Sequence, residues 1–127
     1  MARVRVWLEA PESALLAVAE TADTASTRAH GLLGRDSNDF LPGDGLILDP
    51  CRLIHTFFMR MAIDVVFYDR RLRVTRVARE VRPFRFAWGG WSCRVTLELP
   101  AGTLARIPVR PGAQLRIDAA PVEGASH

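Results

Sequence analysis

Strict alternation of apolar and polar side chains in short segments is the feature that most constrains how this sequence can fold. The clearest case spans residues 92–99, where the apolar residues alternate with polar ones: Cys93, Val95, Leu97 and Leu99 against Ser92, Arg94, Thr96 and Glu98. Shorter alternating segments lie at 3–9 and 114–118. A period of two is typical of a β-strand with one buried face. We therefore predict that the odd-numbered residues of 93–99 are buried and that the even-numbered ones are exposed or bonded to polar groups.

The rest of the chain predicts further strands and little helix. A strand is expected at 15–18, a short one at 46–48, and two within 54–68, separated by a bend near Met61 and Ala62. Between 72 and 81 the apolar residues change from even to odd positions, which indicates a β-bulge near Thr75 or Arg76. Residues 25–33 have apolar side chains at helical spacing. The predicted fold is mainly β (α+β): a small twisted antiparallel β barrel or sandwich with one or two short helices.

Length and composition fit one folded domain. A chain of 127 residues is expected to form a single domain over 1–120, followed by a flexible tail at 121–127. The hydrophobic fraction of 49% and the charged fraction of 24% are those of a protein whose core needs no disulfide or metal. Cys51 and Cys93 are too far apart for a CxxC motif, so both are predicted to be free thiols packed in the core.

Charge narrows the choice of partners. All 17 basic residues are arginine and the net charge is +3, but the arginines alternate with apolar residues and form no dense basic run. Nucleic-acid binding is therefore not expected. Charges interrupt each apolar run near the N-terminus, so we expect neither a secretory signal nor a membrane span there. The sequence as given predicts a cytoplasmic protein or one that has lost its leader.

Several blocks of sequence, in their order and spacing, resemble a known family. The blocks are RAHGLLGR at 28–35, GLIL at 45–48, IHTFFMRMAIDVVFY at 54–68, Pro83, and LELPAGT at 97–103. From about residue 22 to residue 118 this arrangement is similar to the domain-of-unknown-function family 192. The central block, in which an aromatic, methionine and basic stretch leads into Ile63, Asp64 and an apolar strand, is the most specific part.

The resemblance implies a small bacterial or archaeal domain built mainly of β-strands, with no established activity, cofactor or catalytic residue. It also implies that many relatives carry an export signal or a lipoprotein leader, and that some lie beside pilus or secretion genes. This chain has Met61 and Ala62 where relatives often have a polar residue and proline.

Polar residues of the central block are candidates for a binding surface. They are His55, Thr56, Arg60 and Asp64, to which we add Arg28 and Arg35 on one flank of the predicted helix. Arg60 and Asp64 have the same parity in an extended chain, so we predict an ion pair that holds the bend. Glu98, also a candidate for the binding surface, lies on the polar face of its strand and is expected to be solvated or paired with an arginine.

The segment FRFAWGGW at 84–91 combines four aromatic residues with a pair of glycines. Exposed aromatic side chains supply much of the energy of recognition, which places Trp88 and Trp91 in the candidate binding surface. The same rings could instead cover an open end of the barrel, and the sequence does not decide between these two roles.

Two classes of function follow from these residues. The first hypothesis is a binding or accessory domain without enzymatic activity, whose partner is an unknown protein or a small anionic ligand and which needs no cofactor. The alternative is a small hydrolase-like enzyme that uses His55 with Asp64 or Cys51. No second His or Cys lies at ligand spacing, so no metal site is expected. A role in a pilus or secretion assembly is a third hypothesis, which rests only on the resemblance.

Overall fold

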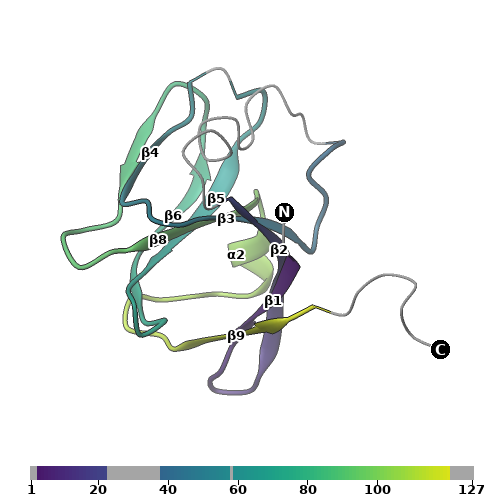
Figure 1. The fold of residues 1–127 in the computed structure, drawn as a ribbon. Coiled ribbons are helices and arrows are strands. Elements are labelled where there is room, and N and C mark those ends of the chain that lie inside the picture. Colours follow the sequence, from purple (N-terminus) through teal and green to yellow (C-terminus); the bar gives the residue numbers. More distant parts are fainter. Residues whose placement is uncertain (1–2, 23–37, 58, 121–127) are drawn as a thin grey trace.

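The computed structural model describes residues 3–22, 38–57 and 59–120, and within them nine strands form two sheets (Figure 1). The larger sheet curls into a half-barrel, with the strand order β6-β5-β8-β3-β2-β1-β9, and the smaller one pairs β4 with β7. The elements are β1 (Arg3–Leu8), β2 (Ala14–Ala22), β3 (Asp44–Leu48), β4 (Leu53–His55), β5 (Ile63–Tyr68), β6 (Val74–Val81), β7 (Phe86–Trp88), β8 (Val95–Pro100), helix α2 (Thr103–Arg106) and β9 (Leu115–Ala119).

The predicted fold class is confirmed as mainly β, with a barrel-like sheet and one short helix in the described part of the chain. One detail of the prediction is wrong, because the sheet is not purely antiparallel. Strands β2 and β3 run parallel, with Val18 opposite Asp44 and Ala22 opposite Leu48. A parallel pair requires a crossover connection, which residues 23–43 provide. The predicted helix at 25–33, with Arg28 and Arg35, lies outside the described residues, as does the tail at 121–127.

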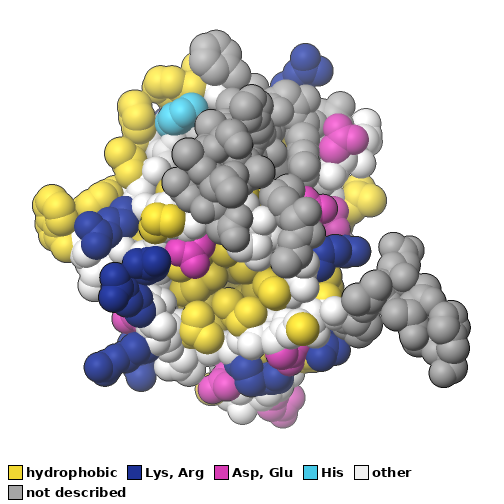
Figure 2. Space-filling view, in the orientation of Figure 1, with side chains coloured by type: hydrophobic (Ala, Val, Ile, Leu, Met, Phe, Trp, Pro, Cys, Tyr) yellow, Lys and Arg dark blue, Asp and Glu magenta, His cyan; other side chains and the backbone are white. Residues whose placement is uncertain are grey.

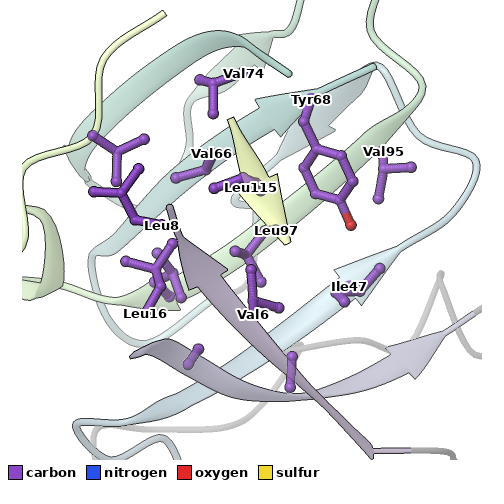
Figure 3. Packing of buried hydrophobic residues seen from close by; sticks show 14 of the residues in the cluster. Val6, Leu8, Leu16, Ile47, Val66, Tyr68, Val74, Val95, Leu97 and Leu115 are labelled. Atoms are coloured by element: carbon purple, nitrogen blue, oxygen red, sulfur yellow. The ribbon is translucent and has the colours of Figure 1, made fainter. Parts of the chain in front are cut away.

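Two apolar cores lie on opposite faces of the large sheet. The inner core fills the half-barrel and includes Val6, Leu16, Ile47, Val66, Leu97, Leu99, Leu104 and Leu115 (Figure 3). The outer core covers the other face and includes Phe40, Leu46, Leu48, Ile54, Met59, Ile63, Val65, Phe67 and Cys93. Strands β3 and β5 contribute apolar residues to both cores. Every residue of β5 and of β8 is buried.

Three predictions within the strands can be compared directly with the structure. The segment 54–68 does form two strands, but β4 and β5 belong to different sheets. The predicted bulge is confirmed at Thr75, because Phe67 lies opposite Arg76 while the next residue, Tyr68, lies opposite Val74. The odd-numbered residues of 93–99 are buried, as predicted.

The half-barrel closes at only one end. Its edge strands β6 and β9 meet where Arg73 bridges to Gln114 and the Val74 amide donates to the Ala113 carbonyl at 2.8 Å. Farther along, β9 pairs with β1, and no pairing between β9 and β6 is found in the described part of the chain. The wall of the barrel is therefore open on that side. None of the described helices is long and apolar enough to cross a lipid bilayer.

Candidate functional site

The open side of the half-barrel forms a cleft of about 520 Å³. Its lining combines the apolar side chains of Val4, Ile47, Leu72, Val95 and Ile117, from the inner core and its partly buried edge, with Thr21 and Tyr68. Figure 2 shows a patch of apolar side chains in the middle of the visible face, with acidic and basic side chains beside it. Arg70 and Arg94 stand at the cleft together with Asp49 and Asp69. A cavity that combines apolar walls with polar groups able to orient a ligand is a common form of small-molecule site.

Tyr68 is one of the polar residues that line the cleft. Only 2% of the residue is exposed, and its hydroxyl points toward the side of the barrel where Ile47 lies (Figure 3). Burial, with the nearby Asp49 carboxylate and the Cys93 thiol, raises the pKa of Tyr68 well above its usual value. The hydroxyl therefore keeps its proton at physiological pH. Among the residues that the structure describes, it has no hydrogen-bond partner, so it can donate to a ligand.

A second hollow of about 650 Å³, here called the arginine groove, adjoins the cleft and shares Asp69, Arg70 and Arg94 with it. Its other lining residues are Pro50, Cys51, Arg52, Leu53, Arg71, Trp91, Ser92 and Cys93. Arg94 lies between the two hollows, and its Nε is 3.4 Å from Asp49 Oδ1. Four guanidinium groups against one lining carboxylate make the groove a favourable place for an anion.

Both cysteines are free thiols, as predicted, but only Cys93 is fully buried. Cys51 is half-buried in the wall of the arginine groove, and its thiol donates to the Leu53 carbonyl at 3.4 Å. Burial is the main cause that raises the pKa of the Cys93 thiol. A thiol with a raised pKa is a poor nucleophile, so Cys93 serves packing rather than reaction.

Asp64 does not form the predicted ion pair with Arg60, so that prediction is wrong. The Asp64 side chain is 1% exposed, and both of its oxygens accept backbone amides: Oδ1 from Glu80 and Oδ2 from Leu104, each at 2.8 Å. Arg60 is exposed and has no ion pair with any described residue. The strand β6 has a second bulge opposite Asp64, between Ala78 and Val81. Asp64 therefore joins β5 to this bulge and to the short helix α2.

Thr56 is fully buried and holds a turn in place instead of contacting a partner. Its hydroxyl donates to the Arg82 carbonyl at 2.6 Å and accepts the Arg85 amide at 2.9 Å. Its own amide donates to the Arg85 carbonyl, and its carbonyl accepts the Phe84 amide. These bonds fix the turn at 82–85 in one conformation, with Phe84 at a positive φ of 64°.

His55 lies on an exposed surface made by the small sheet, which we call the aromatic face. Its members are Leu53, His55, Phe57, Phe84, Phe86, Trp88 and Trp91. The register of β4 and β7 places His55 opposite Phe86 and Leu53 opposite Trp88 on the same side. Phe57 packs against His55, Phe84 and Phe86, with ring centroids 5.0–6.0 Å apart. In Figure 2 apolar side chains flank the histidine at the upper left.

Glu98 departs from its predicted environment. It is 5% exposed, although it was expected to be solvated or paired with an arginine, and it forms no salt bridge with a described residue. The register places it between Leu46 of β3 and Val65 of β5, inside the outer core. Burial raises the pKa of Glu98 from 4.5 to about 7. Its neighbour Thr96, also buried, donates to the Cys51 carbonyl at 3.0 Å and so meets the prediction of a polar partner.

The geometry gives no support to the hydrolase alternative. Both oxygens of Asp64 are engaged by backbone amides, so this carboxylate cannot orient an imidazole. His55 Nδ1 accepts the Phe57 amide at 3.3 Å, on the exposed aromatic face. Across the described ranges no group of three or more metal-ligating side chains gathers, and the expected independence from metal stays a prediction.

The cleft residues are the ones that the sequence pattern missed. The sequence pattern predicts Tyr68 as the last apolar residue of the strand at 63–68. It predicts Arg94 as a residue on the polar face of the strand at 93–99. The available signal is the change from an apolar run to Asp69, Arg70 and Arg71 directly after Tyr68. A tyrosine at the end of a buried strand, followed directly by charged residues, indicates the rim of a barrel, where ligands commonly bind.

Comparisons with known proteins agree with this architecture. The model of the DUF192 family, described as "Uncharacterized ACR", matches residues 8–117. A Novosphingobium aromaticivorans protein of unknown function has a similar structure, with a TM-score of 0.77 and 20% identity over 90% of this chain and 83% of its own. The structure of a candidate transcription regulator from Sinorhizobium meliloti is also similar, with a TM-score of 0.76. It is 23% identical in sequence, and the match covers 91% of this chain and 92% of that one. No curated protein matches the sequence. At these identities the two structures share the fold with this chain.

Proposed function

The chain belongs to the DUF192 family, and from this premise and the geometry of the cleft we propose that it is a binding domain for an organic anion that carries an apolar part. The observation that carries the proposal is the Tyr68 hydroxyl, a protonated donor in a cleft that has apolar side chains and two arginines in its lining. Ligands gain most of their affinity from apolar burial, and a few polar groups fix their orientation.

Each part of such a ligand has a matching part of the cleft. The apolar part would lie against Val4, Leu72 and Ile117, and its polar group would accept a hydrogen bond from Tyr68. Arg70 and Arg94 stand close enough to the same cavity to hold a carboxylate or phosphate. The volume of about 520 Å³ falls within the range of roughly 300–1,000 Å³ that small-molecule sites have.

Binding of decanoate tests the proposal. Calorimetric titration of the full chain should detect decanoate, with weaker binding of decanol, which lacks the charge, and of acetate, which lacks the chain. The double variant Arg70→Gln and Arg94→Gln should weaken decanoate binding by about tenfold or more, because it removes both guanidinium groups. Tyr68→Phe should weaken it by a similar factor, since it removes the donor inside the cleft.

Arg110→Gln is the matched control, because Arg110 is exposed and does not line the cleft. It should leave decanoate binding unchanged. Equal affinity for decanoate and decanol, or a Tyr68→Phe variant that binds as the wild type does, would contradict the proposal, and so would the absence of any binding.

A role in a pilus or secretion assembly stays a prediction, because it rests on the resemblance alone. The Sinorhizobium protein is described as a transcription regulator, but its likeness to this chain is limited to the fold and does not bear on the proposal.

A further inference from the structure

The aromatic face exposes more apolar surface than a solvated sheet normally does. Leu53 is 52% exposed, Phe84 63%, Phe86 65% and Trp91 82%. Their neighbours Ile54 and Ala87 point the other way, and Ile54 packs into the outer core. Contiguous exposed apolar residues of this kind mark a surface that contacts something else.

The face is held in a fixed shape before any partner arrives. The four backbone and hydroxyl contacts of Thr56 hold the turn that carries Phe84. Gly89 anchors the other end, because its amide donates to the Arg52 carbonyl and its carbonyl accepts the Thr75 hydroxyl. Rings presented by a fixed scaffold lose little conformational entropy on binding, which favours association.

The charge around the face is mainly positive, although Asp69 lines the adjoining groove and Asp49 pairs with Arg94. Segments 50–63 and 81–97, which form the small sheet and its connections, contain no Asp or Glu and contain five arginines. These arginines are Arg52, Arg60, Arg82, Arg85 and Arg94. The whole chain has a net charge of only +3, so positive charge is concentrated here. The surface is therefore complementary to an anionic partner.

We propose that the aromatic face is a peripheral docking site for a lipid membrane that contains anionic headgroups. Hydrocarbon and indole side chains flanked by basic residues are the composition of segments that lie in the membrane interface. Phe84, Phe86 and Leu53, each more than half exposed, have no polar side-chain atom that a protein partner would need to satisfy. A second copy of the chain is a poor occupant, because its own arginines would face these arginines. This inference is independent of the cleft and its ligand.

Co-sedimentation with vesicles tests the docking site. The full chain should bind vesicles of phosphatidylcholine mixed with phosphatidylglycerol, bind pure phosphatidylcholine much less, and dissociate as salt is raised. Tryptophan emission should shift to the blue on binding, as the exposed indole of Trp91 leaves water, and Trp91→Phe should remove most of this shift. Phe84→Ser with Phe86→Ser should weaken binding by about tenfold or more, and Arg82→Gln with Arg85→Gln should do the same.

Matched controls come from other surfaces of the molecule. Leu15→Ser and Leu41→Ser remove exposed apolar side chains outside the face, and Arg110→Gln removes an exposed arginine elsewhere, so none of them should change vesicle binding. Each variant is melted first, and only variants with the wild-type melting temperature are compared. The substituted side chains of the face are themselves exposed, so the fold should tolerate their loss.

Three results would overturn the proposal. If the wild-type protein does not bind anionic vesicles, the face would instead be a contact site for another protein. Vesicle binding unchanged in Phe84→Ser with Phe86→Ser would mean that net charge alone attracts the chain. A dimer in sedimentation velocity that this double variant dissociates would mean that a second copy covers the face.

Discussion

Glu98 illustrates how one side chain is affected when a strand is buried on both faces. Alternation predicts a polar side of β8 that faces water, yet the outer core covers this side and leaves Glu98 5% exposed. A carboxylate loses hydration energy in such a place, so the neutral acid is favoured and the pKa rises to about 7. Periodicity identifies the face on which a residue lies, but it cannot show that another segment covers that face.

The raised pKa makes stability depend on pH. Because the folded protein binds the Glu98 proton more tightly than the unfolded chain does, the free energy of unfolding falls as pH rises from 4.5 to about 7 and then levels off. The total loss is about 3 kcal/mol. Glu98→Gln should flatten this slope and raise stability at pH 8 in urea melts. Glu12→Gln, at an exposed site, should keep the slope, and a slope that persists in Glu98→Gln would contradict the assignment.

At the scale of elements, much of the fold could be predicted, because strands with one buried face have a regular period. Most strand positions, the break between β4 and β5 near Met61 and the bulge at Thr75 follow from local patterns, whereas β7 does not. The parallel pairing of β2 with β3 could not be predicted, since it depends on a connection between distant residues. The predicted partnership of Arg60 and Asp64 failed for a similar reason. A carboxylate can accept backbone amides from distant loops, and those bonds leave no trace in sequence spacing.

Asp64 connects three elements, and its substitution should show this. Asp64→Asn puts an amide group opposite one of the two backbone donors, Glu80 or Leu104, so a buried hydrogen bond is lost. We expect a loss of about 3 kcal/mol in the free energy of unfolding. Arg60→Met at the exposed neighbouring site should change it by less than about 0.5 kcal/mol.

A double-mutant cycle distinguishes this role from the ion pair that the sequence suggested. The two substitutions should add, with no coupling energy, because the residues do not contact each other. A coupling energy of about 1 kcal/mol or more would restore the ion pair and contradict the bonds described for Asp64.

At the scale of the whole molecule, the aromatic face, the arginine groove and the cleft form one continuous surface. Leu53 and Trp91 belong to the face and also line the groove, while Arg70 and Arg94 line both the groove and the cleft. If both proposals hold, a membrane under the face would lie beside the arginines that lead to the cleft. The two binding events would then be coupled, with anionic amphiphiles as ligands common to the membrane and the cleft.

The two cores should unfold together, because β3 and β5 are shared between them. Leu97→Ala removes a side chain from the inner core and Leu46→Ala removes one from the outer core, and both residues are almost fully buried. Each substitution should lower the free energy of unfolding by about 2–5 kcal/mol. The whole transition should move to lower urea in both variants, with far-UV circular dichroism and tryptophan emission giving the same midpoint.

Leu41→Ser, an exposed site, serves as the control and should leave the midpoint unchanged. Two separate transitions in Leu46→Ala, with the tryptophan signal of β7 lost before the circular dichroism of the half-barrel, would contradict the shared-strand argument. The small sheet would then be a separate folding unit resting on the barrel. A single transition means that any ligand of the cleft also stabilises the aromatic face, since binding to the folded state alone raises the stability of the entire cooperative unit.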